Sequence, residues 1–261
     1  MMEKLIVFVF GSIVGSFLNV CIYRLPKNES VVIPASHCPN CKRPIPWHDN
    51  IPILSYIILR AKCRFCGSKI RFRYFIVEVL TAILLTVLFA AFRGTPEKFF
   101  AYSVLTCGLI VATFVDFEVQ EIPDQITLGG ILIGLVLSFI FPSIFGREAA
   151  RWHGLIYSAI GAVVGGLSIY IIGFFGELAF KREAMGGGDV KLMAAIGAFL
   201  GWKLVIMTFF IAPVFGSMVG LFLKMKEGRE IIPYGPYLSL GALISIFWGE
   251  KILQVLFNGI F

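Results

Sequence analysis

The sequence of 261 residues is poor in charge, because Asp, Glu, Lys and Arg together make up only 15% of it. Soluble globular chains carry about a quarter charged residues. Hydrophobic residues reach 58% and the mean hydropathy is +0.87. This composition excludes a soluble domain, a disordered chain and a secreted disulfide scaffold. It predicts an all-α polytopic membrane protein.

Other features are scarce or missing. There are three histidines, at positions 37, 48 and 153, which disfavours a Ser/His catalytic pair but leaves a Ser/Lys pair open. The sequence has no glycine-rich fingerprint of a soluble methyltransferase. The first apolar run is too long for a signal peptide and no small-x-small cleavage motif follows it, so we expect that run to stay in the membrane.

The apolar segments are long enough to cross a bilayer, which takes about 20 mostly apolar residues. The sixth segment is short, and the break around Gly201 could instead be a kink in one long span, so eight spans are expected and seven remain open. The candidate spans are 5–23, 75–92, 99–115, 126–145, 156–180, 190–202, 204–223 and 237–257.

The basic residues are unevenly distributed between the loops. The loop 24–74 carries ten Lys or Arg. If it faces the cytoplasm and eight spans alternate, 16 of the 23 basic residues lie on that side, including Arg182 and Arg229. The positive-inside rule therefore predicts a cytoplasmic loop and both termini outside. We assign the excess positive charge of +7 to topology and anionic membrane lipids rather than to a nucleic-acid partner.

The same loop holds two C-x-x-C pairs, Cys38–Cys41 and Cys63–Cys66. Two such pairs indicate one tetrahedral Zn²⁺ site with four thiolate ligands. Four protein ligands leave no position for a catalytic water, so the metal should be structural and should stabilise an insertion too small to fold on a core of its own. A disulfide or redox pair is the alternative, which the predicted cytoplasmic location disfavours.

Three of the four aspartates fall at the predicted cytoplasmic ends of spans: Asp116, Asp124 and Asp189. Ionisable groups at membrane depth are costly and usually functional. Asp124 and Asp189 could instead be helix N-caps, because both stand where a helix begins. Asp116 fits that explanation less well, since it ends a helix.

Asp189 follows a run of three glycines, Gly186, Gly187 and Gly188. A cap does not need this run, whereas bare backbone lets an extended peptide approach closely; a flexible loop is the alternative. If Asp116 and Asp189 converge, two carboxylates sharing one proton can activate water, as in aspartic proteases. For Glu78 we consider pairing with a cation such as Arg73, or a place in a substrate groove.

Several motifs together resemble the bacterial type IV prepilin peptidases, which are membrane aspartic proteases with a Gly-x-Gly-Asp motif. They are Gly-Ser-Phe-Leu-Asn-Val-Cys-Ile-Tyr-Arg-Leu-Pro at 15–26, the C-x-x-C pairs with Asp-Asn-Ile-Pro-Ile-Leu-Ser at 49–55 between them, and Arg-Tyr-Phe-Ile-Val-Glu at 73–78. Asp116, the Ile-Pro-Asp ending at Asp124, and the Gly-x-Gly-Asp ending at Asp189 complete the set.

This resemblance implies that Asp116 and Asp189 are catalytic, with Asp124 and the three glycines in support. It implies cleavage of the basic leader of prepilins or pseudopilins after a glycine, at the cytoplasmic face of the bacterial inner membrane. It also implies N-methylation of the new N-terminus with S-adenosylmethionine, whose site the sequence does not locate. The separation of Asp116 and Asp189 is longer than the family pattern suggests, and we place the excess around 142–153.

We therefore expect a first transmembrane helix (1–23), a cytoplasmic zinc-binding loop domain (24–74) and a membrane-embedded peptidase domain (75–261). A transporter with a zinc regulatory domain and a non-catalytic assembly protein are the alternatives. A transporter would place ionisable groups near the bilayer midplane, whereas here they gather at one face. The oligomeric state and the pilus or secretion system that supplies the substrate are left open by the sequence.

Overall fold

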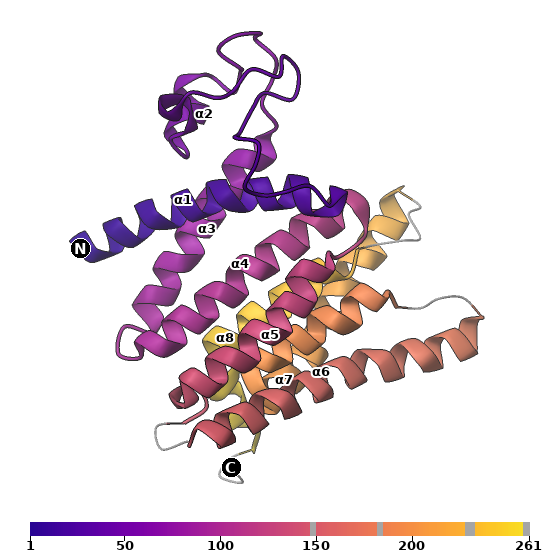
Figure 1. Cartoon of the computed structure of the whole chain (residues 1–261). Helices are drawn as coiled ribbons and strands as arrows, with labels where there is room; N and C mark the ends of the chain where they lie inside the picture. The colour runs from indigo at the N-terminus through magenta and orange to yellow at the C-terminus, as the bar shows by residue number, and fades with distance from the viewer. Residues whose placement is uncertain (147–149, 182–184, 228–232, 258–261) are drawn as a thin grey trace. The chain divides into compact units, whose positions relative to one another are not determined.

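The computed structural model describes residues 1–146, 150–181, 185–227 and 233–257. Arg182 and Arg229, counted above among the basic residues, lie outside these ranges. The described residues form helices and two isolated antiparallel bridges, with no longer strand, so the all-α fold is confirmed. The helices are α1 (Met2–Arg24), α2 (Leu54–Ile58), α3 (Phe72–Ala91), α4 (Pro96–Val119), α5 (Asp124–Ile140), α6 (Arg151–Phe180), α7 (Gly187–Glu227) and α8 (Gly235–Phe257) (Figure 1).

Six of the described helices are long and apolar enough to cross a membrane: α1, α3, α4, α6, α7 and α8. The seventh apolar helix, α5, is shorter because Pro142 follows it. A proline disfavours helical backbone in the residue before it, and Phe141 is accordingly non-helical, with φ −121° and ψ 68°. The predicted span 126–145 therefore ends as a helix at Ile140.

Helix α7 contains both the sixth and the seventh predicted spans, and the chain reverses between them. Gly201 has φ 74° and ψ 172°, outside helical geometry. Residues before and after the break contact the same residue of α6. A Cβ on Gly165 would lie 2.4 Å from the carbonyl oxygen of Met193 and 3.0 Å from Val205 Cγ2. The two arms, 187–200 and 202–227, thus form a hairpin (Figure 1). With the arms counted separately, the described residues contain the eight apolar helical segments expected.

The chain divides into two compact units, Met1–Gly94 and Thr95–Phe261. In the first unit, α1 and α3 pack antiparallel through small residues. A Cβ on Gly11 would lie 2.8 Å from Ala82 Cα, and one on Gly15 would lie 2.7 Å from Glu78 Cα. Glycine at these positions lets two membrane helices approach backbone to backbone.

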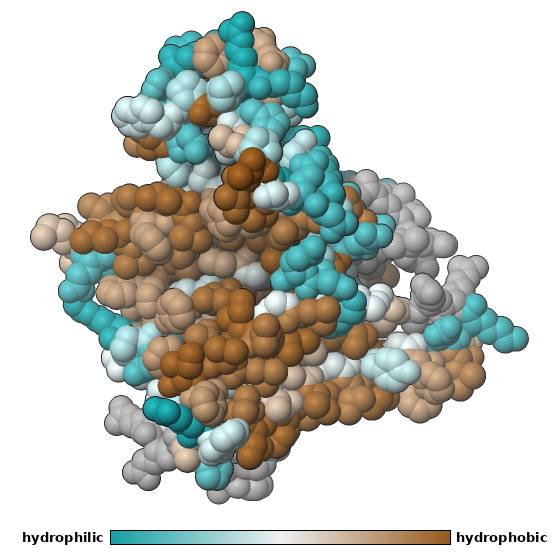
Figure 2. Space-filling view, viewed as in Figure 1, coloured by the Kyte–Doolittle hydropathy of each residue, from teal (hydrophilic) through white to brown (hydrophobic). Residues whose placement is uncertain are grey.

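The insertion between α1 and α3 carries two antiparallel bridges, His37 with Pro44 and Lys62 with Lys69, and the short helix α2. Hydrophilic residues cover much of its surface, whereas the long helices present broad hydrophobic surfaces (Figure 2). This contrast is what a membrane-anchored insertion requires.

In the second unit, α7 is central and packs against α5, α6 and α8, while α4 packs against α5 and α8. The contact between α6 and α7 is made by glycines: a Cβ on Gly197 would lie 2.0 Å from the carbonyl oxygen of Gly161. This packing brings the end of α4 together with the starts of α7 and α8.

Candidate active site and metal centre

Asp116 and Asp189, the two aspartates expected to act together, lie close enough for their charges to interact. Asp116 is in the last turn of α4 and only 5% exposed. Asp189 is in the first turn of α7 and half-buried. The packing of α4 and α7 in the second unit thus places two carboxyl groups together.

A backbone amide holds one of these carboxyl groups. The N–H of Gly235, the first residue of α8, donates to Asp116 Oδ2 at 2.9 Å. A Cβ on Gly235 would lie 2.8 Å from the same oxygen, so a side chain there would displace the carboxyl group. The sequence analysis missed Gly235, which is 119 residues from its partner and carries no chemical group of its own. The Tyr-Gly-Pro-Tyr run around it signals only a turn.

Ile122 fills the space beside the pair. It is 8% exposed and lies between the α7 glycines and α8: a Cβ on Gly188 would be 3.3 Å from Ile122 Cβ, and one on Gly235 would be 3.2 Å from Ile122 Cδ1. Apolar packing of this kind excludes water from one side of the carboxyl pair.

The three glycines before Asp189 are not required by left-handed backbone geometry, since none has a positive φ. Gly186 and Gly187 are exposed, and nothing lies within 4 Å of a Cβ built on Gly187. They therefore bare a stretch of backbone next to a carboxyl group, which suits an approaching peptide.

Asp124 is not an N-cap, because Pro123 occupies the cap position and makes no side-chain cap hydrogen bond. Its carboxylate instead accepts a hydrogen bond from Lys191 at 2.6 Å, and both side chains are about half exposed. Exposed ion pairs contribute about 0–1 kcal/mol. The ion pair thus connects α5 to α7 at Lys191, which is two residues after Asp189.

Tyr234 stands beside Asp189 and was also missed. Burial, reinforced by the Asp189 carboxylate, raises the pKa of Tyr234 to about 12. Its hydroxyl therefore stays protonated at neutral pH and is available as a hydrogen-bond donor at the edge of the site.

The four insertion cysteines converge as predicted. Their sulfur atoms all lie within 4.8 Å of one another, with 3.8 Å between those of Cys38 and Cys66. Each pair sits on a tight turn, because Lys42 N–H donates to the carbonyl of Cys38 and Gly67 N–H to that of Cys63. This cluster could hold a metal ion.

Polar neighbours support the cluster. Hydrogen bonds from Ser68, from its hydroxyl first and its backbone second, lower the pKa of the Cys66 thiol to about 6. Arg64, between the cysteines of the second pair, donates to Asp49 at 2.6 Å, and its guanidinium lowers the pKa of that carboxyl. The Arg64–Asp49 pair ties the second turn to the short 3-10 helix Trp47–Asn50.

Glu78 accepts hydrogen bonds from two other parts of the first unit. Its carboxylate accepts the backbone N–H of Ile53, in the insertion, at 2.7 Å and a hydrogen bond from Ser16 of α1. It is 8% exposed. Glu78 therefore connects the insertion to the α1–α3 pair, a role for which the sequence pattern gave no signal.

Helices of membrane length, a carboxyl pair with one buried and one half-buried member, and a four-cysteine cluster define a multi-pass membrane protein with the groups of an aspartic hydrolase. Comparison with known proteins gives the family. Residues 9–92 match the bacterial peptidase A24 N-terminal domain and residues 103–221 match the type IV leader peptidase family. The chain belongs to this family, and the boundary between the two matches falls where its two units divide.

Curated relatives agree with that assignment. A prepilin leader peptidase/N-methyltransferase of Pseudomonas putida is 34% identical, over 94% of this chain and 90% of the relative. One from Aeromonas hydrophila is 34% identical over 95% of this chain and 92% of its own length. One from Myxococcus xanthus is 39% identical over 85% of this chain, which spans 63% of that relative. No solved structure matches the chain.

Proposed function

We propose that this protein is a membrane aspartic endopeptidase that cleaves the basic leader of type IV prepilins or pseudopilins after a glycine, and that it N-methylates the new N-terminus. The observation that carries the peptidase proposal is the pairing of Asp116 with Asp189 next to a bare glycine backbone. Membership of the leader peptidase family and the names of the relatives supply the substrate class.

In the proposed reaction, one aspartate is ionised and takes a proton from a water molecule, whose oxygen attacks the scissile carbonyl. The other aspartate, protonated, donates its proton to the carbonyl oxygen as the tetrahedral intermediate forms. As the intermediate collapses, the C–N bond breaks and the aspartate that took the proton from water gives it to the leaving amine. The other aspartate regains its proton from a hydroxyl of the intermediate. The Gly235 amide fixes the orientation of Asp116, and Gly186–Gly188 accept the leader as extended backbone.

We propose that the cysteine cluster binds a structural Zn²⁺ through Cys38, Cys41, Cys63 and Cys66. Bonds of about 2.3 Å in a tetrahedron require sulfur atoms about 3.8 Å apart. The sulfur atoms of Cys38 and Cys66 have this separation, and all four lie within 4.8 Å of one another. When bound, the metal would supply cross-linking rather than catalysis. The insertion 24–74 would then be a zinc-stapled domain between the helix 1–23 and the peptidase domain 75–261.

N-methylation would use S-adenosylmethionine, but we assign it no site. The cavity of about 710 Å³ in the first unit is lined mainly by apolar side chains, and Arg24 is the only ionisable residue among those described there. A cationic nucleoside needs carboxylate or other acceptor partners that this lining does not provide. We therefore derive no methyl-transfer step.

We propose the bacterial inner membrane as the location, with the insertion and the aspartate pair on the cytoplasmic side. The charge distribution of the sequence supports this orientation. Prepilins or pseudopilins and membrane lipids are the proposed partners, with no role for nucleic acid.

Purified protein mixed with a prepilin peptide should release a shortened product. Asp116→Asn and Asp189→Asn should each lower the cleavage rate by several orders of magnitude, because neither variant retains the carboxyl pair. Asp124→Asn is the matched control and should retain substantial activity, since it loses only an exposed ion pair. Inactivity of Asp124→Asn together with an active Asp116→Asn would show that the pair has been misassigned.

A further inference from the structure

The turn 51–55 at the edge of the insertion pairs all but one of its backbone N–H groups within the insertion. Ser55 N–H donates to the carbonyl of Ile51, Leu54 N–H to that of Pro52, and Ile57 N–H to that of Ile53. Ile51 N–H donates to the hydroxyl of Ser55, which donates in turn to the carbonyl of His48. Because Pro52 has no N–H, only the amide of Ile53 remains to be paired within the turn.

That last amide is paired by a buried carboxylate. Ile53 N–H donates to Glu78 Oε2 at 2.7 Å, six residues into α3 and thus about 9 Å along it at 1.5 Å per residue. The backbone at Ile53 has φ 65° and ψ −53°, a γ-turn geometry that is strained for a β-branched residue. Glu78 therefore holds a strained turn against the side of a membrane helix.

The side chains of this edge are apolar and face outwards. Leu54 is 55% exposed and Ile58 72%, and on the neighbouring loop Val32 and Ile33 are 76% and 74% exposed. An irregular loop in water does not need all its amides paired by protein, whereas an irregular segment in hydrocarbon must have every polar backbone group paired by protein. The turn combines the two features that a lipid environment requires.

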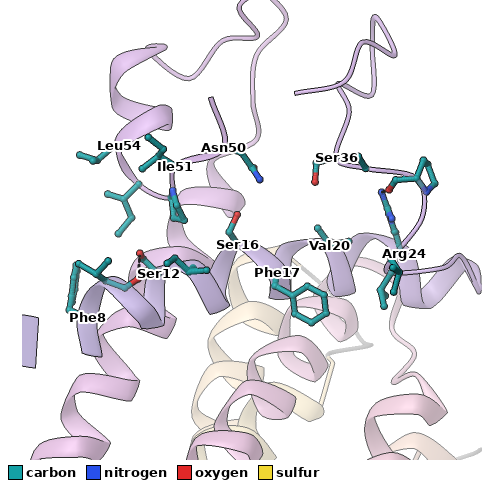
Figure 3. A pocket seen from close by; sticks show the side chains of 18 of the residues that line it. Phe8, Ser12, Ser16, Phe17, Val20, Arg24, Ser36, Asn50, Ile51 and Leu54 are labelled. Atoms are coloured by element: carbon teal, nitrogen blue, oxygen red, sulfur yellow. Dashed lines mark hydrogen bonds between the residues drawn. The ribbon is translucent and has the colours of Figure 1, made fainter. Parts of the chain in front are cut away.

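The same edge faces a groove along α1. The groove has a volume of about 710 Å³ and lies between the α1 face that carries Phe8, Ser12 and Val20 and the insertion segments around Val32 and Leu54. Ile51 and Leu54 lie over the middle of α1, near Ser12, and Ser36 lies near Arg24 at the C-terminal end of the helix (Figure 3). Its walls include Ile13 and Phe17, which are 53% and 51% exposed on a membrane-spanning helix.

We propose that the turn 51–55 dips into the membrane leaflet beside α1, moored by Glu78, and that the groove holds a phospholipid acyl chain. The occupant follows from the walls: they are continuous with the outer face of a membrane span, which the bilayer covers. Arg24 does not hold a headgroup within the groove, because it is 6% exposed and donates to the carbonyls of Ser30 and Pro34. The groove thus recognises a chain and not a charge.

The proposal can be tested by fluorescence quenching of the full chain in lipid nanodiscs. All four tryptophans are replaced by phenylalanine, and one tryptophan is reintroduced by Leu54→Trp. The matched control is Phe65→Trp, at an exposed site between the cysteines of the second pair. Phospholipids brominated in mid-chain should quench Leu54→Trp at least about twofold and leave Phe65→Trp nearly unchanged. Aqueous acrylamide should produce the opposite order.

Both variants must retain about one zinc per chain, which verifies the fold of the insertion without any activity assay. If Leu54→Trp loses the metal, Ile58→Trp on the same edge replaces it. Equal acrylamide quenching at both positions, with no effect of brominated chains, would overturn the proposal. If added S-adenosylmethionine protected Leu54→Trp from quenching, that result would also overturn the proposal, because it would assign the groove to the methyl donor.

Discussion

Replacing Gly235 tests the position of the Asp116 carboxyl group without changing any group that takes part in the reaction. It contributes only a backbone N–H and the absence of a side chain, yet it contacts the carboxyl group of Asp116. A carboxyl group displaced by about 1 Å can lose about 100-fold in rate without any change in its chemical identity.

We therefore predict that Gly235→Ala lowers cleavage by about 100-fold while the protein stays folded, because the new methyl group meets Asp116 Oδ2 at 2.8 Å. Gly129→Ala in α5 is the control, since nothing lies within 4 Å of a Cβ there. Rates at matched membrane levels and melting temperatures of both variants would test this. Wild-type activity in Gly235→Ala would mean that the amide does not position Asp116.

At the scale of single residues, the sequence identified groups that carry chemistry and missed groups that act through the backbone. The cysteine spacing predicted that the four sulfur atoms come together, and that convergence is confirmed, whereas the bound metal stays a prediction. The roles of Asp116 and Asp189 remain a proposal. Gly235 and Tyr234 are far from both aspartates in the sequence, and no local sequence pattern connects them to the site.

Among the elements, we expect the insertion to depend on the proposed metal, because it has few buried residues of its own. We predict that the purified protein contains about one Zn²⁺ per chain and that Cys38→Ser or Cys63→Ser releases it. Cys107→Ser, outside the cluster in α4, should retain the metal. Elemental analysis of the three proteins decides the matter, and full zinc retention in both cluster variants would reject the site.

The turn 51–55 gives a second prediction at this scale. Glu78→Gln keeps an acceptor for the Ile53 amide, whereas Glu78→Leu leaves that donor unpaired and should cost about 1–3 kcal/mol. We expect the melting temperature to fall clearly in the leucine variant and little in the glutamine variant. Equal melting temperatures would show that the hydrogen bond between Ile53 and Glu78 contributes nothing to stability.

At the scale of the elements, sequence periodicity predicted the helices but not the contacts between them. It located the long apolar helices among the described residues and suggested the break at Gly201, but not that the chain reverses there. It placed Glu78 in a span without indicating its partner, because the contact with Ile53 joins a helix to an irregular turn 25 residues away. Such contacts depend on tertiary packing, which leaves no period in the sequence.

For the molecule as a whole, sidedness is the property that the charge distribution predicts. A membrane-impermeant thiol reagent applied outside should label Gly146→Cys and not Asn40→Cys, each in a background without the native cysteines. The positive-inside rule is the reason, since the insertion carries ten basic residues. Permeabilised cells provide the control, in which both positions should react. Labelling of Asn40→Cys alone in intact cells would reverse the topology.

The hairpin in α7 has a consequence for how the protein is made. Its first arm, 187–200, would span only about 21 Å as a helix, less than the hydrocarbon thickness of about 30 Å. A helix this short does not enter the bilayer readily by itself and must do so together with the neighbouring helices. The glycines that join it to α6 at Gly161 and Gly197 then control the yield of the newly synthesised chain, so enlarging them should reduce the amount of enzyme in the cell while each surviving molecule keeps its two aspartates.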